Sequence, residues 1–75
     1  MLIYPNPFNN QFTVEYGLEN KTAVLTIYNL MGVKVAEQTL TSQKTTVDLS
    51  NVANGIYFAV ITEGNIKTHQ KIVKQ

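Results

Sequence analysis

The sequence predicts an all-β domain: a small antiparallel β-sandwich with two sheets, about seven strands and an immunoglobulin-like arrangement. Two observations support this fold class. Apolar residues recur mostly at every second position, as in strands with one buried face, and the runs are separated by Gly, Asn, Asp or Ser. No stretch has the apolar spacing of a helix, and 75 residues leave room for only one hydrophobic core. We therefore expect a single domain over residues 1–75.

The first two strands are predicted at residues 11–16 and 22–29. In the first of them, Phe12 and Val14 alternate with polar residues, so that one face is buried. Residues 22–29 are rich in β-branched, apolar and aromatic side chains on both faces, which is typical of a more central strand. Residues 4–7 contain two prolines, which lack a backbone donor, so this segment cannot lie in a central strand.

A hairpin and a short strand follow. Gly32 can adopt the positive φ of a tight turn, and residues 33–40 then resume the strand pattern. Residues 45–49 alternate between inward apolar and outward polar side chains, which predicts a short strand. Residues 50–54 contain Ser and Asn and are expected to make a compact corner.

The last two strands are predicted at residues 55–62 and 66–73. The first is the most apolar stretch of the chain, so both of its faces are expected to be covered and the strand to be central. The second places Lys67, His69 and Lys71 on one face, which is typical of an edge strand protected from pairing with other chains. The predicted core consists of Leu25, Ile27, Val47, Leu49, Ile56, Phe58 and Val60.

Composition excludes several classes of function. One His, no Cys and five scattered carboxylates provide neither a metal cage nor a disulfide. All six basic residues are lysines, so the Arg side chains best suited to phosphates and bases are missing, and nucleic acid is not an expected partner. No apolar run reaches the roughly 20 residues that span a bilayer, and no signal peptide is recognisable.

The titratable and nucleophilic side chains give no sign of catalysis. His69 stands on a lysine-bearing strand face, with no Ser, Cys or carboxylate near it in the sequence. Asp48 is expected to accept backbone hydrogen bonds in a turn, and Ser50 lacks the glycines of a nucleophile elbow. We therefore predict that the domain is not an enzyme and holds no cofactor.

Residues 49–57 resemble a tyrosine corner, in which a Tyr hydroxyl bonds back to backbone a few residues upstream. The pattern consists of Leu49, a turn containing Gly55, and Tyr57 at the start of a central strand. The Tyr57 hydroxyl is expected to bond to the corner at residues 50–54. Such a corner supports the fold without identifying a function.

Four segments stand out along the chain: Tyr4-Pro5-Asn6-Pro7-Phe8, the Y-N-x-x-G-x-x-V hairpin within residues 27–35, the D-L-S-x-x-x-x-G-x-Y corner at residues 48–57, and Gln70-Lys71-Ile72-Val73-Lys74. In this order they resemble the C-terminal sorting domain of the type IX secretion system (Por secretion system) of Bacteroidetes. Each segment alone is weak, but together they run the whole length of the chain. Two small departures concern the C-terminus and composition: the chain ends in Gln where many members end on a basic residue, and it lacks Arg.

The resemblance implies a non-catalytic sorting signal that is covalently part of a larger secreted cargo protein, with residues 1–75 as its C-terminal domain. Such a cargo passes through the periplasm, and the outer-membrane translocon then recognises the domain and moves the cargo to the cell surface or the medium. In many members a sortase-like surface protease removes the domain and joins the cargo to anionic lipopolysaccharide.

The resemblance also points to six positions that match shared C-terminal motifs, as candidates for recognition by the translocon: Gly55, Tyr57, Lys71, Ile72, Val73 and Lys74. A physical argument supports the last strand as the recognised element. An edge strand can pair with a strand of another protein, and its lysines add charge steering. The alternative is that these lysines only keep the edge soluble.

Two other functions are compatible with the sequence. A carbohydrate-binding or adhesive sandwich appended to a secreted enzyme would need an exposed aromatic cluster, for which Tyr4, Tyr16 and Tyr28 are the candidates. A fibronectin-like spacer within a modular protein would predict more chain beyond Gln75.

Overall fold

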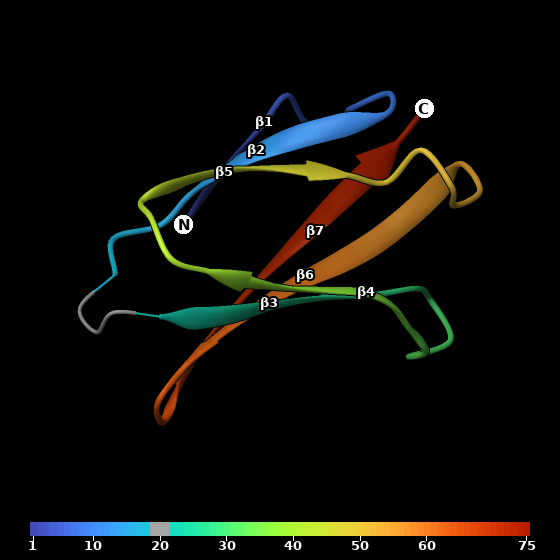
Figure 1. Ribbon diagram of the computed structural model, residues 1–75. Helices are drawn as coiled ribbons and strands as arrows, with labels where there is room; N and C mark the ends of the chain where they lie inside the picture. The colour runs from blue at the N-terminus through green and yellow to red at the C-terminus, as the bar shows by residue number, and fades with distance from the viewer. Residues whose placement is uncertain (19–21) are drawn as a thin grey trace.

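The computed structural model describes residues 1–18 and 22–75, and these residues form seven strands without a helix. The strands are β1 (Leu2–Tyr4), β2 (Gln11–Glu15), β3 (Ala23–Tyr28), β4 (Lys34–Leu40), β5 (Lys44–Asp48), β6 (Gly55–Glu63) and β7 (Ile66–Lys74). They make two layers, a sheet in the order β1-β2-β5 and a sheet in the order β4-β3-β6-β7 (Figure 1). Neighbouring strands in both sheets are antiparallel. The predicted all-β two-sheet sandwich is confirmed.

Strand boundaries agree with the six predicted ranges to within one residue at each end. The strand that the sequence did not predict is β1, which pairs with β2 at the edge of the three-stranded sheet. It ends immediately before Pro5. This placement agrees with the exclusion of the proline segment from a central strand, because β1 is a short edge strand.

The core lies between the two sheets and uses the inward-facing residues of both. From opposite layers, Phe12 and Val14 in β2 and Leu25 and Ile27 in β3 are each only 1% exposed. The Phe8 ring lies edge-on to the Phe12 ring, with a centroid separation of 4.9 Å. Four of the predicted core residues are confirmed, namely Leu25, Ile27, Val47 and Leu49.

The predicted core is wrong in β6, where the opposite face points inward. Ile56 and Phe58 are 37% and 38% exposed, and Val60 is half-buried. The buried apolar residues of this strand are Tyr57, Ala59 and Ile61. Both faces of β6 are apolar, so alternation defines two faces without saying which one meets the core. The strand is central in its sheet, between β3 and β7, but its outer face is not covered by another layer.

Candidate functional site

The six candidate residues come together at one end of the β6–β7 ladder. The register pairs Gly55 with Lys74 and Tyr57 with Ile72, while Val73 and Lys71 lie beside Ile56 and Phe58. In Figure 1 this end of β7, in red, extends toward the three-stranded layer. The sequence motifs therefore converge on one region although they are separated along the chain.

Two of these residues build the corner that leads into β6. The Tyr57 hydroxyl donates a hydrogen bond to the carbonyl of Ala53 at 2.6 Å, and the residue is 6% exposed. This contact confirms the predicted bond back to the corner. Gly55 has a φ of 145°, in a region that side-chain-bearing residues rarely adopt, so glycine is needed where the chain turns into the strand.

Ile72 and Lys74 are buried from β7. Ile72 is 0% exposed and faces the core, two residues before Lys74 on the same face. Lys74 is 6% exposed, and its ammonium donates to the carbonyl of Val52 at 2.5 Å and to that of Ser50 at 3.5 Å. A buried ammonium needs such acceptors, so Lys74 ties the last strand to the tyrosine corner.

The outer edge of β7 is occupied along its C-terminal half. The side chain of Asn6 donates to the carbonyl of Lys71 and accepts from the amide of Val73, both at 3.1 Å. The amide of Phe8 then donates to the Val73 carbonyl at 2.9 Å, and Gln75 donates to the Phe8 carbonyl at 2.8 Å. This changes the expectation that a receptor strand pairs here, because residues 6–8 already occupy that edge.

The N-terminal half of β7 has a different environment. Lys67 and His69 have exposed side chains and, by strand alternation, point their backbone groups to the same edge as Val73. Within residues 1–18 and 22–75 no hydrogen bond to these backbone groups was found. Lys71 is the one candidate residue whose side chain is exposed, and it makes no ion pair with the described residues.

Sequence reasoning did not assign roles to Asn6 and Phe8. The signal was present in the Tyr4-Pro5-Asn6-Pro7-Phe8 segment, which we used only to exclude a central strand and as part of the family resemblance. Both peptide bonds that precede the prolines are cis, and the segment crosses from β1 to the edge of β7. Phe8 is 1% exposed, so this crossing also contributes to the core.

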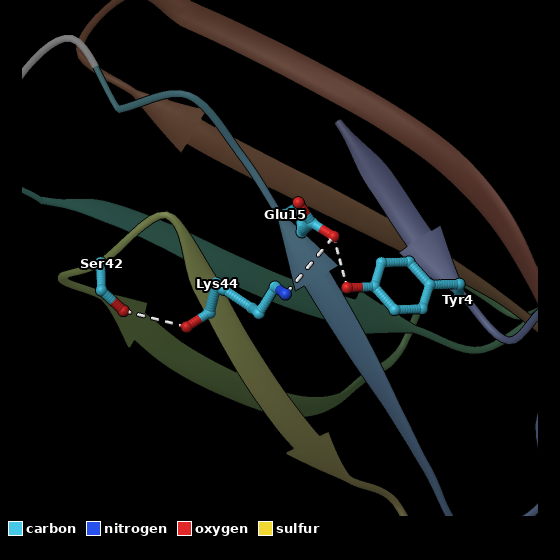
Figure 2. A network of polar contacts seen from close by, with 4 residues as sticks. All are labelled: Tyr4, Glu15, Ser42 and Lys44. Atoms are coloured by element: carbon cyan, nitrogen blue, oxygen red, sulfur yellow. Dashed lines mark hydrogen bonds and ion pairs between the residues drawn. The ribbon is translucent and has the colours of Figure 1, made fainter.

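The outer face of the three-stranded sheet carries a small polar network (Figure 2). The Tyr4 hydroxyl donates a hydrogen bond to the Glu15 carboxylate, and the Lys44 ammonium lies 4.0 Å from the same carboxylate oxygen. The hydrogen bond to Glu15 raises the pKa of the Tyr4 phenol above its ordinary value of 10.0. At the other end of β5, hydrogen bonds from the Ser50 side chain and backbone lower the pKa of Asp48 below 3.8.

The aromatic cluster required by a carbohydrate-binding function is not formed by the three candidate tyrosines. Tyr4 belongs to the network of the three-stranded sheet, whereas Tyr28 is half-buried on the outer face of the other sheet. Tyr16 packs against the core, and its hydroxyl donates to Glu63 at 3.2 Å. They lie in three separate places, so this alternative loses its support from the sequence.

Other kinds of site are absent from the described part of the chain. Residues 1–18 and 22–75 enclose no detected pocket and gather no group of three metal-ligating side chains. No helix formed by these residues is long and apolar enough to cross a membrane.

Comparison with known families decides the relationship. A family model described as the secretion system C-terminal sorting domain matches residues 2–75. The chain belongs to this family. No curated protein matches it. Sorting domains of this kind serve type IX secretion and are generally non-catalytic, and the match spans both the crossing segment and the motif-bearing end of β7.

Proposed function

We propose that this sorting domain, as the C-terminal part of a larger secreted protein, carries its cargo through the type IX translocon and past the outer membrane. The cargo passes through the periplasm and ends at the cell surface or in the medium, and the domain itself catalyses nothing. The match of the family to nearly the whole chain is the observation that carries this proposal. A sortase-like surface protease is the second partner, which separates the domain from the cargo and attaches the cargo to the surface.

The six candidate residues have two different roles in this proposal. Gly55, Tyr57, Ile72 and Lys74 act through the fold, because they are buried or form the corner that holds β7 in place. Lys71 acts directly, because its side chain is exposed to a partner. Val73 has its backbone groups bound to Asn6 and Phe8, so it fixes the crossing segment on β7.

The direct test is a fusion of residues 1–75 to the C-terminus of a reporter with a signal peptide, expressed in a Bacteroidetes host with a working type IX system. We expect the reporter at the surface or in the medium, and we expect the same host without the translocon to retain it in the periplasm. The mass of reporter released unattached into the medium reports cleavage, because removal of the domain lowers the mass of the fusion by 8.4 kDa. A reporter that stays periplasmic, while a sorting domain native to the host exports it, would contradict the proposed function.

Matched variants separate recognition from folding. Phe12→Ala removes a core ring and should abolish export by unfolding the domain. Lys71→Gln keeps the strand and removes only an exposed charge, so a loss of export from a folded variant would support a direct role. Lys74→Gln is unsuitable for this purpose, because the Lys74 ammonium is buried and holds the corner.

A further inference from the structure

The exposed apolar side chains of the domain are concentrated at one end of the four-stranded sheet. Among residues 1–18 and 22–75, seven large hydrophobic residues are exposed, and five of them lie at this end, namely Leu30, Met31, Val33, Ile56 and Phe58. The register explains their proximity, because the turn after β3 adjoins Tyr28, and Tyr28 pairs with Phe58. We call these five residues the apolar end. Exposed apolar side chains gathered in one region mark an interaction site more often than isolated ones do.

The protruding part of the apolar end is held in one conformation by Asn29. The Asn29 side-chain oxygen accepts hydrogen bonds from the amides of Met31 at 2.9 Å and Val33 at 3.0 Å. The Asn29 backbone closes the same turn by bonding Gly32 and Val33, each at 3.0 Å. Gly32 has a φ of 79°, which the turn requires. Met31 is 86% exposed, so a rigid turn presents an apolar side chain that contributes nothing to the core.

Positive charge borders the apolar end. One cross-strand row contains Lys34, Tyr28, Phe58 and Lys71 in that order, so a lysine stands on each side of the aromatic pair. Among the residues that the structure describes, this outer face carries three lysines, at positions 34, 67 and 71, and one glutamate, Glu37. The Glu37 carboxylate lies 3.7 Å from the Lys34 ammonium and forms an ion pair with it. Lys71 therefore has no ion-pair partner among the described residues.

We propose that the apolar end and Lys71 form a docking surface for a protein whose contact surface is apolar with acidic side chains at its rim. This inference rests on the proposed function, since it names the surface by which the export machinery holds the domain. Burial of Met31 and Leu30 provides the apolar centre of the contact, and Met31 adapts its flexible thioether side chain to the partner. Lys71 contributes charge complementarity, which orients the partner and raises the association rate.

A protein fits this surface better than a membrane does. A lipid surface would take up the exposed turn, whereas Ile56 and Phe58 lie on the face of the sheet beside it. A partner must follow both the turn and the sheet face to cover the whole apolar end. A second copy of the domain presents the same positively charged border, so the lysines would repel one another.

The test compares two double variants of the reporter fusion that remove equal numbers of exposed apolar side chains. Leu30→Ser with Met31→Ser changes the turn, and Leu2→Ser with Ile66→Ser changes the two exposed residues outside the apolar end. A second pair compares Lys71→Glu with Lys67→Glu, which is on the same face but four residues, or roughly 13 Å, along β7. Circular dichroism and thermal melting of each variant verify that it is folded.

We expect the turn variant to lower the exported fraction by about tenfold, as loss of a central apolar contact does, while its control exports normally. Lys71→Glu should lower export more than Lys67→Glu. If the turn variant unfolds, Met31→Asp replaces it, because an 86% exposed side chain is not needed for folding, and this variant should also reduce export. Normal export by folded variants of the turn would overturn the docking surface and leave the proposed function intact.

Two further measurements test the alternative partners, which are a lipid surface and a second copy of the domain. Flotation of the 75-residue domain with vesicles of phosphatidylethanolamine and phosphatidylglycerol tests lipid, and sedimentation velocity tests self-association. Binding to vesicles or dimerisation that the turn variant loses, and its control retains, would overturn the proposal of a protein partner. Failure of the unmodified fusion to leave the periplasm contradicts the proposed function and removes the docking proposal with it.

Discussion

The outer faces of the two sheets differ in whether their charged side chains are paired and in how much apolar surface they expose. On the three-stranded sheet, Glu15 pairs with both Tyr4 and Lys44, so the charges on this face are matched locally (Figure 2). On the four-stranded sheet, Phe58 is partly exposed, and the neighbouring Lys71 makes no ion pair with the described residues. The first face exposes one large apolar side chain, Leu2, beside a locally paired carboxylate, whereas the second has several partly exposed apolar side chains and a lysine without an ion pair among the described residues.

The requirements of folding explain the first face but not the second. Folding requires only that the solvent-facing side of a sheet carry polar residues at alternating positions. Partly exposed rings on that side add little to a core that lies on the other side. The family motifs lie beneath and beside the open face, where Tyr57, Ile72 and Lys74 hold the end of β7. The buried motif residues therefore hold β7 in place, while exposed residues of the same motif segments, such as Met31 and Lys71, lie on the open face.

The largest expected effect distinguishes an inward ring from an outward one. Phe12→Ala should cost about 3–5 kcal/mol, comparable to the whole stability of a domain this size, because Phe12 is 1% exposed. Phe58→Ala should cost only about 1–2 kcal/mol, because its 38% exposed ring gains less from burial. Urea denaturation followed by circular dichroism measures both. Equal losses would show that the outer face of β6 is as important to folding as the core.

The next effect separates two lysines of β7. Lys74→Met keeps the aliphatic chain but leaves the carbonyls of Val52 and Ser50 without their donor, so it should lose about 1.5–3 kcal/mol. Lys71→Met changes an exposed side chain and should stay within about 0.5 kcal/mol of the wild type. Thermal melting of the pair tests this difference. A similar loss in both variants would contradict the distinction between a structural lysine and a recognition lysine.

Strand positions could be predicted from the sequence, because alternation and turn residues are local signals. Which face of β6 points into the core could not be predicted, because both faces are similarly apolar. The buried face depends on the corner to which the Tyr57 hydroxyl is bound. The sequence also did not predict that residues 6–8 occupy the outer edge of β7. Asn6 and Lys71 are 65 residues apart, and a contact between an irregular segment and a distant strand leaves no periodic pattern.

The same limit applies to the candidate site. The motif residues were identified by resemblance, but their burial separates structural positions from exposed ones, and only Lys71 presents its side chain to solvent. The apolar end was not predicted, because Leu30 and Met31 were interpreted only as part of a hairpin turn. An exposed apolar turn and a buried one have the same composition, so the sequence alone does not separate them.

A smaller effect is expected at the tyrosine corner. Tyr57→Phe retains the ring and removes the 2.6 Å hydrogen bond to the Ala53 carbonyl, so it should cost about 0.5–1.5 kcal/mol. Thermal melting of the purified domain measures the change. Export of the fused reporter should be retained, because the outer face is unaltered. An unchanged melting temperature would indicate that the corner does not depend on this bond.

The smallest effect concerns the polar network of the three-stranded sheet and appears at high pH. The hydrogen bond to Glu15 raises the pKa of Tyr4 in the folded domain above 10.0, so the folded state retains the phenol proton more strongly than the unfolded state does. The resulting stability is present below pH 10.0 and is lost as the pH rises through the higher folded pKa. Because this network is exposed, the change in melting temperature should be small.

Tyr4→Phe should remove this component of the alkaline destabilisation, whereas Tyr28→Phe, on the other sheet, should retain it. Thermal melts between neutral and strongly alkaline pH separate the two variants, and identical profiles would contradict a locally matched network around Glu15.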